Sequence, residues 1–363
     1  MRLRDVVVAG GGPAGLAVAA EAARRGLDAL VLERRPLPAD KACGEGLLPR
    51  AVSALDALGV RPHLDPDGVA PFQELHWIQE DGSRAEARLP APGGLGVRRL
   101  ALSAALAARA RELGAEIRDR TALLAHRREP DRVVCTMEGS DPVEARLLVA
   151  ADGLGSPIRE REGLSRPVRG RRRFGLRRHY AVRPWAAAVE VHFDEGAEAY
   201  VTPAGPDRVG VAFLFEEGQA PDFDALLSRF PRVLDRIAGA AHDSTLAGSG
   251  PLARRAAARV LDRLVLVGDA GGYVDAITGE GLTLAFEEAR LLGEVLPAAV
   301  AGGARRQDLQ AWEREVAARF RRYAVAARAV LALARRPRLR RAAIRRLEGH
   351  PGAFTALVAR AMG

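Results

Sequence analysis

The sequence has almost no lysine and very little cysteine. Only one of its 55 basic residues is a lysine, Lys41. This skew is typical of a bias toward arginine codons, and it explains the net charge of +9 without a nucleic-acid partner, for which no motif is present. A weak attraction for anionic substrates or membrane surfaces stays open. Cys43 and Cys135 give neither a disulfide framework nor metal-ligand spacing, so we expect no metal site.

Long apolar runs are also missing. No stretch reaches the length of a membrane span, and the N-terminus passes directly into a strand pattern without a signal peptide. We therefore expect a cytoplasmic protein. With 363 residues of ordinary globular composition, the chain is long enough for one large domain or two interwoven ones.

The first fifteen residues carry the most informative motif. Residues 5–9 are an apolar, β-branched run that predicts a buried parallel strand, and Gly10-Gly11-Gly12-Pro13-Ala14-Gly15 follows before a helical pattern. Gly10 permits the tight turn, Gly12 lets the backbone approach a pyrophosphate, and Gly15 lets the helix pack on the strand. The pyrophosphate is expected at the helix N-terminus, where free N–H groups and the helix dipole favour negative charge.

A carboxylate stands where the ribose of such a ligand needs one. The second predicted strand, residues 28–32, ends at Glu33, which is expected to accept hydrogen bonds from the ribose hydroxyls. Arg34 follows it and is expected at the same site. The pattern predicts a ligand with an ADP moiety, and NAD and FAD both satisfy it at this point.

Two later loops also leave the carboxyl ends of predicted parallel strands, which is where ligands bind in open α/β sheets. The apolar run 147–151 ends in Asp152-Gly153, and the run 263–267 ends in Gly268-Asp269. Asp269 is expected to accept from the hydroxyls of a ribityl chain. Gly279-Glu280-Gly281-Leu282 opens a predicted helix, whose N–H groups would face a ring carbonyl of a flavin.

The other segments alternate between two patterns. A period of two recurs in 72–89, as a hairpin, and in four segments between 172 and 215, which predicts an antiparallel sheet that the hairpin joins. Residues 222–240 and 305–362 are expected to be helical, the latter with breaks near Pro337 and Pro351. We expect an α/β fold with a Rossmann-like dinucleotide-binding domain (1–70, 98–171 and 256–304), an inserted antiparallel-sheet substrate domain (71–97 and 172–255) and C-terminal helices (305–363).

The three loop motifs, in this order, resemble those of the FAD-dependent oxidoreductases of the para-hydroxybenzoate hydroxylase superfamily. They are Gly10–Glu33, Asp152–Arg159 and Gly268–Ala270. Arg99, at the start of a predicted long helix, resembles the arginine that these proteins place near the flavin phosphates. The resemblance implies FAD in an extended pose, a sheet domain over the flavin ring, and NADH or NADPH as a transient reductant, because we find no second dinucleotide-binding motif.

Two motifs resemble the geranylgeranyl reductase branch more than the aromatic hydroxylases. They are the run 41–47, Lys-Ala-Cys-Gly-Glu-Gly-Leu, and the run 268–281, which has no proline before its Gly-x-Gly segment. The chain departs from that branch at Glu45, where glycine is usual. The segment Tyr200–Pro203 also lacks the tryptophan of the branch's lipid-site motif. Flavin halogenases are disfavoured, because their Trp-x-Trp-x-Ile-Pro run is missing.

The resemblance leaves two flavin chemistries open. Reduced flavin passes a hydride to a double bond, or it reacts with oxygen to a hydroperoxide that hydroxylates an activated ring. Both need a dry, apolar pocket, so we expect a lipophilic substrate such as a polyketide, quinone or prenyl compound. We favour monooxygenation, which dominates the superfamily, over double-bond reduction. A non-enzymatic dinucleotide-binding protein is a third alternative, and the sequence does not specify an oligomeric state.

Hydride transfer to an alkene also needs a proton donor, for which Cys43, Glu45 and Tyr200 are the candidates. The residues predicted to contact FAD are Gly10, Gly12, Pro13, Ala14, Gly15, Glu33, Arg34, Cys43, Arg99, Asp152, Gly153, Gly268, Asp269, Gly279, Gly281 and Leu282.

An arginine cluster stands where the chain enters the predicted sheet domain. It is either a solvated crossover or a docking patch for the phosphates of NADPH or for an acidic substrate carrier. Its members are Arg169, Arg171, Arg172, Arg173, Arg177 and Arg178.

Overall fold

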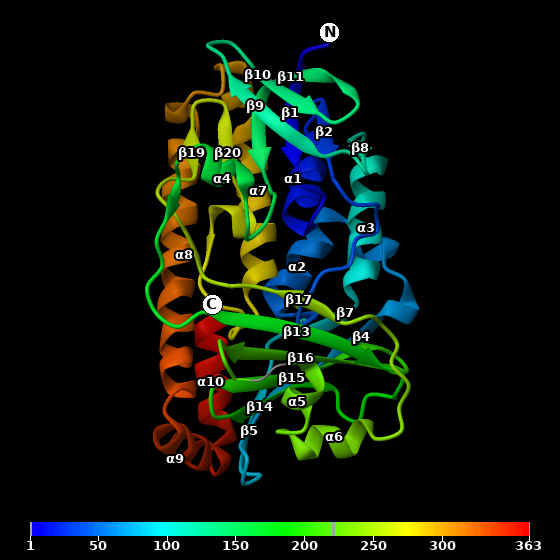
Figure 1. Ribbon diagram of the computed structural model, residues 1–363, viewed down its shortest axis with the longest axis vertical. Helices are drawn as coiled ribbons and strands as arrows, with labels where there is room; N and C mark the ends of the chain where they lie inside the picture. Colours follow the sequence, from blue (N-terminus) through cyan, green and yellow to red (C-terminus); the bar gives the residue numbers. More distant parts are fainter. Residues whose placement is uncertain (1, 220–221, 363) are drawn as a thin grey trace.

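The molecule is elongated, with a mainly parallel sheet in one half and a second large sheet, turned across it, in the other (Figure 1). The computed structural model describes residues 2–219 and 222–362. The long helix α8 (Arg306–Ala334) runs beside both halves.

The first large sheet is built from buried runs of valine, leucine and alanine. Its main path is β19 (Val260–Leu261), β20 (Leu264–Leu266), β11 (Ser140–Ala150), β1 (Arg4–Ala9), β2 (Ala29–Leu32) and β8 (Glu116–Arg118). The pairs from β20 to β8 are parallel, so the carboxyl ends of β1, β11 and β20 meet at one edge. An antiparallel extension consists of β9 (Leu123–Arg128) and β10 (Val133–Met137).

Three helices cover one face of this sheet. Helix α1 (Pro13–Ala23) packs against α3 (Arg99–Glu112) and α7 (Gly281–Ala301), and the interface is made of small and branched apolar side chains. Pro13 is the first residue of α1, where its missing N–H removes no helical hydrogen bond. The first loop is thereby fixed at the start of a fully packed helix.

The prediction of a purely antiparallel second sheet is wrong, because one pair of its strands is parallel. Its order is β17 (Ala247–Ser249), β13 (Arg173–Tyr180), β16 (Arg208–Glu216), β15 (Ala197–Gly205), β14 (Ala188–Asp194), β5 (Glu74–Ile78) and β6 (Arg84–Arg88). The hairpin β5–β6 does join this sheet, but β5 pairs with β14 in parallel. Alternation of polar and apolar residues specifies which face of a strand is buried, but it carries no information on strand direction. The direction of β5 relative to β14 could therefore not be predicted from this pattern.

Short elements complete the fold, and those of residues 223–237 pack on the second large sheet. Residues 223–237 form two short helices rather than one, because Pro231 starts the second. The remaining strands are β3 (Gly46–Leu47), β4 (Val69–Phe72), β7 (Gly94–Val97), β12 (Ser165–Arg166), β18 (Arg254–Ala256) and β21 (Gly272–Tyr273). The remaining short helices are α2 (Pro49–Leu58), α4 (Pro157–Arg161), α5 (Phe223–Leu227), α6 (Pro231–Ile237), and the 3₁₀ turns η1 (Arg61–His63), η2 (Pro66–Gly68) and η3 (Gly268–Gly271).

The C-terminal helices break where prolines predict it. Helix α8 is followed by α9 (Pro337–Glu348) and α10 (Pro351–Met362), and both α9 and α10 pack on β6. Among the helices of the described residues, none combines the length and the apolar character that crossing a bilayer requires. The predicted domain boundaries stay a prediction.

Candidate functional site

The first glycine-rich loop has the geometry that a dinucleotide needs. Gly10 has φ +110°, and a Cβ there would lie 2.4 Å from the carbonyl oxygen of Ala151. A Cβ on Gly15 would lie 2.0 Å from the carbonyl oxygen of Gly10, so helix and strand approach too closely for any other residue. A Cβ on Gly12 would meet nothing within 4 Å, because this residue faces a cavity. Gly10 and Gly15 therefore stand where a turn and close packing exclude a side chain, and the approach of a pyrophosphate to Gly12 stays a prediction.

Glu33 lies against this loop. Its buried carboxylate accepts the N–H of Gly11 at 2.7 Å and the N–H of Arg35 at 3.0 Å. Glu33 and Arg34 both line the cavity. The carboxylate of Glu33, which we expect to bind the ribose, thus lies at the amino end of α1, beside the expected phosphate site.

The other two loops converge on the first. Arg159, buried at the end of the second loop motif, donates to the carbonyl oxygens of Leu154 at 2.8 Å and Ala270 at 2.9 Å. It therefore ties the loop after β11 to the loop after β20. A Cβ on Gly268 would lie 2.9 Å from the Cβ of Ala14, which brings the third loop against the first. The second motif ends at Arg159, but its local pattern does not indicate this role, because the acceptor at Ala270 lies 111 residues away.

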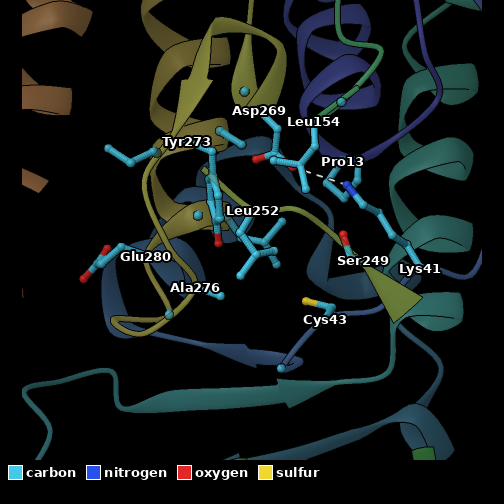
Figure 2. A pocket seen from close by; sticks show the side chains of 18 of the residues that line it. Pro13, Lys41, Cys43, Leu154, Ser249, Leu252, Asp269, Tyr273, Ala276 and Glu280 are labelled. Carbon is cyan, nitrogen blue, oxygen red and sulfur yellow. Dashed lines mark hydrogen bonds and ion pairs between the residues drawn. The ribbon is translucent and has the colours of Figure 1, made fainter. Parts of the chain in front are cut away.

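The lone lysine also reaches this site. The Nζ of Lys41 lies 3.2 Å from the Oδ2 of Asp269, and both side chains are partly exposed. Figure 2 shows the pair bridging the two sides of the pocket. The loop 41–47 is thus held opposite the residue predicted to bind a ribityl chain.

One cavity of about 1240 Å³ is lined by every predicted FAD contact except Gly15, which is buried where α1 packs on the first loop. Its lining includes residues of all three loops, among them Gly153, Gly279, Gly281 and Leu282, together with strands of the second sheet. That volume exceeds the ~300–1000 Å³ of ordinary ligand pockets, which leaves room for a dinucleotide and a second molecule.

Unpaired polar atoms in the cavity wall test whether FAD fits. Nε and Nη1 of Arg99, Oδ1 of Asp152 and the hydroxyl of Thr278 are buried without a partner, and all three residues line the cavity. A buried polar group without a partner costs free energy, so these atoms point to a ligand with both acceptors and donors. Phosphates would satisfy Arg99, and ribityl or ribose hydroxyls would satisfy Asp152. Burial also raises the pKa of Asp152. The residues therefore fit FAD.

The start of α7 lies at the far end of the same wall. Gly279 has φ +71°, and its N–H bonds to the carbonyl of Ala276, so the chain turns sharply into the helix. Burial raises the pKa of Glu280, the N-cap residue, to about 7. Contact of Gly281 and Leu282 with a flavin ring stays a prediction.

The candidate proton donors differ in their surroundings. Figure 2 shows the sulfur of Cys43 directed into the pocket, and this sulfur accepts the N–H of Glu45 at 3.3 Å. The buried carboxylate of Glu45 instead accepts the N–H of Arg99 at 2.8 Å and lies 2.5 Å from Nε2 of His179. Glu45 thus supports Arg99, and the geometry favours a positioning role over the predicted proton transfer.

Tyr200 is bound to the third loop. Its hydroxyl donates to the carbonyl of Ile277 at 2.8 Å, and burial raises its pKa well above the ordinary value. The side chain keeps its proton and holds the segment before Gly279. Among the three candidates, Cys43 is the group that best combines an exchangeable proton with access to the cavity.

The arginine cluster is not a docking patch as a whole. Arg173 is buried between Glu198 at 2.5 Å and Asp275 at 2.9 Å, and Arg177 is buried beside Asp40. Arg171 and Arg172 pair with Glu216 and Glu217, and Arg178 pairs with Asp224. The carboxylates are distant in sequence, so the pairing could not be seen in the run of arginines.

The fold and the converging loops define a class: an α/β protein with a dinucleotide site at the carboxyl edge of a parallel sheet. The particular family follows from the match of residues 4–327 to the FAD binding domain model, which shows that the chain belongs to this family of FAD-dependent oxidoreductases. The predicted resemblance to the para-hydroxybenzoate hydroxylase superfamily is confirmed.

Individual relatives have different activities. The chain is 32% identical over 330 residues to digeranylgeranylglycerophospholipid reductase 1 of Methanopyrus kandleri, covering 82% of this chain and 81% of the relative. It is 31% identical over 353 residues to the 12-dehydrotetracycline 5-monooxygenase/anhydrotetracycline 6-monooxygenase of Streptomyces rimosus, covering 86% and 66%. The solved structure of the Diels–Alderase PyrE3 from pyrroindomycin biosynthesis aligns with a TM-score of 0.81 and 27% identity, over 99% of this chain and 80% of that one.

Proposed function

We propose that this FAD-dependent protein reduces a carbon–carbon double bond of an apolar, isoprenoid-like substrate, with NADH or NADPH as the reductant. The observation that carries the proposal is the thiol of Cys43, which faces an otherwise largely apolar part of the cavity. From the sequence alone we favour monooxygenation. We reverse that order because a proton donor beside the substrate is needed for alkene reduction, whereas hydroxylation of an activated ring does not need this thiol.

FAD, once reduced, supplies the hydride. The chain's own residues supply the surroundings. The wall opposite the three loops comes from alternate residues of strands of the second large sheet, so their apolar side chains exclude water from the reaction. These residues are Leu75 and Trp77 of β5, Val189 and Val191 of β14, and Ala212 and Leu214 of β16.

Cys43 completes the addition by giving its proton to the second alkene carbon. The N–H of Glu45 fixes the sulfur as an acceptor, which leaves the S–H bond free to point into the cavity. Glu45 itself is held by Arg99 and His179, so the turn that carries the thiol is rigid. Lys41 and Asp269 close the polar end of the same loop.

Monooxygenation is the second candidate, favoured by the identity to the tetracycline monooxygenase over most of this chain. The two chemistries differ in their need for oxygen. With a prenylated quinone as substrate and NADPH supplied, reductase activity would proceed at full rate under anaerobic conditions. Oxygen uptake that matches NADPH oxidation would establish the monooxygenase instead. Absence of substrate-dependent NADPH oxidation in both conditions would overturn both proposals.

The thiol is tested by Cys43→Ala. Because a positioned proton donor contributes about 10²–10⁴-fold to a rate, we expect anaerobic turnover to fall by at least 10²-fold. Turnover is expressed per bound FAD, because Cys43 is also a predicted FAD contact. Cys135→Ala, which alters the other cysteine, in β10 away from the cavity, is the matched control. Equal turnover of the Cys43 variant and the wild type would refute the role of the thiol.

A further inference from the structure

The positive charge of this protein is concentrated at one end of the chain. Residues 316–363 contain 12 arginines and one acidic residue, Glu348. The preceding 315 residues contain 43 basic and 45 acidic residues, so they carry a small negative net charge. A preference for arginine over lysine accounts for the type of basic residue but not for this distribution. The C-terminal helices therefore account for the whole excess of positive charge.

Some of these arginines line up on one face of α8. Arg321 and Arg328 follow the helical repeat of α8, with Val325 between them, and Arg336 lies just beyond the end of the helix, near Arg328; all four side chains are exposed. Within the described residues these three arginines form no ion pair. Other arginines of the tail do pair, such as Arg335 with Glu216 and Arg341 with Glu80. The face of α8 thus keeps free guanidinium groups available to a partner.

The cavity reaches the surface beside this face. Its lining includes Val325 and Val330 of α8 and Leu357 of α10. Val325 is 67% exposed and Leu357 is 54% exposed, so these residues form the rim of the cavity and not its interior. Arg322 and Arg360, both exposed, lie on the same rim. An apolar opening is therefore surrounded by positive charge.

We propose that the surface formed by α8 and α10 docks on an anionic lipid bilayer, and that the cavity receives its apolar substrate from that bilayer. Basic residues near a negatively charged bilayer contribute about 1 kcal/mol each, and exposed apolar side chains among them insert at the interface. A nucleic acid would use the arginines but would gain little from Val325 and Leu357, whereas the interior of a bilayer takes up both side chains. Docking is independent of the reaction, whereas substrate entry from the bilayer rests on the proposed function.

Vesicle flotation of the FAD-loaded, full-length protein tests the docking. We expect binding to vesicles of phosphatidylcholine mixed with phosphatidylglycerol, weakening with added salt, and little binding to phosphatidylcholine alone. Arg321→Gln/Arg328→Gln/Arg336→Gln should weaken binding roughly 100-fold, from about 1 kcal/mol for each arginine. The matched control, Arg111→Gln/Arg120→Gln/Arg127→Gln, removes three exposed arginines at α3, beside β8 and in β9 and should bind as the wild type does.

A second variant separates a bilayer from other anionic partners. Val325→Ser/Leu357→Ser should weaken vesicle binding by a similar factor at low and at high salt, because it removes only the apolar contribution, which salt does not screen. Duplex DNA serves as a polyanion without an apolar phase. The proposal is overturned if the control variant loses as much vesicle binding as the α8 variant, or if the wild type binds DNA but no vesicles. Anaerobic turnover of a detergent-dispersed substrate reports the proposed function independently of docking.

Discussion

Glu33 lies beside the first glycine-rich loop, as its place in the sequence predicts, and its contact with a ribose stays a prediction. The end of the second strand predicted a ribose ligand, and the structure places the carboxylate against Gly11 of the phosphate loop. Because this carboxylate is buried and lines the cavity, we expect it to contribute strongly to the retention of FAD.

We expect Glu33→Ala to weaken FAD binding by at least 10-fold, since loss of a hydrogen bond to a charged group costs about 1.5–3 kcal/mol. Quenching of flavin fluorescence on titration of the FAD-free protein measures the dissociation constant. Glu138→Ala, an exposed glutamate in the turn after β10, is the control and should leave the constant unchanged. Unchanged FAD affinity of the Glu33 variant would refute the assignment.

Glu280 carries a prediction about pH. Burial raises the pKa of its carboxyl from 4.5 to about 7, so the folded protein holds this proton more tightly than the unfolded chain. Stability from this group is fully present below pH 4.5 and is lost as the pH rises to 7. The variant Glu280→Gln should therefore match the wild type at pH 5. At pH 8 it should be more stable by about 2 kcal/mol after allowance for partial exposure. Urea unfolding of both proteins at pH 5 and pH 8 measures the two free energies of unfolding. If Glu280→Gln differed from the wild type by the same amount at both pH values, the prediction would be wrong.

Among the helices, α9 depends on one buried arginine. Arg340 donates to the side chain of Gln79 at 3.1 Å, to Glu80 at 2.7 Å and to the carbonyl of Ala334 at 2.6 Å. It also lies over the ring of Phe193. These contacts fix α9 to the hairpin β5–β6 and to β14, and thereby hold the C-terminal helices on the second sheet.

Arg340→Met keeps the length of the side chain but removes these hydrogen bonds. We expect a loss of about 3 kcal/mol in the free energy of unfolding, because buried acceptors are left without partners. Amide hydrogen exchange in α9 and α10 should be faster in the variant than in the wild type, and this increase should be larger there than in other segments. Arg338→Met, at an exposed position of the same helix, should change neither measurement. Equal protection of α9 in the Arg340 variant and the wild type would contradict the anchoring role.

The positions of helices and strands could be predicted from the sequence better than the partners with which they pair. The three loops and their strands followed from local patterns, because glycine spacing and apolar runs are set by neighbouring residues. The parallel pairing of β5 with β14 and the ion pair of Arg173 with Asp275 join segments more than 70 residues apart, and nothing in the local pattern encodes them. For the same reason the sequence suggested Glu45 as a proton donor without revealing His179 beside it.

At the scale of the whole molecule, buried polar pairs join the two halves. Glu45 with His179 and Arg177 with Asp40 connect the loop 40–47 to β13. Arg173 of β13 holds Asp275, in the loop that leads to α7, together with Glu198 of β15. The flavin-side loops and the wall of the substrate cavity are therefore held in one arrangement by charge pairs, in addition to apolar packing.

The variant Arg173→Met tests this connection. It leaves the carboxylates of Asp275 and Glu198 buried without their cation, which should cost about 3–5 kcal/mol at pH 8. Burial already raises the pKa of both groups, and loss of the arginine raises them further. Protonation then relieves the repulsion, so the loss should be smaller at pH 5 than at pH 8. Arg172→Met, which breaks only the exposed pair with Glu217, is the control for urea unfolding at both pH values. A loss that is independent of pH would mean that Arg173 acts through packing alone, and the two halves would then be held together without this charge cluster.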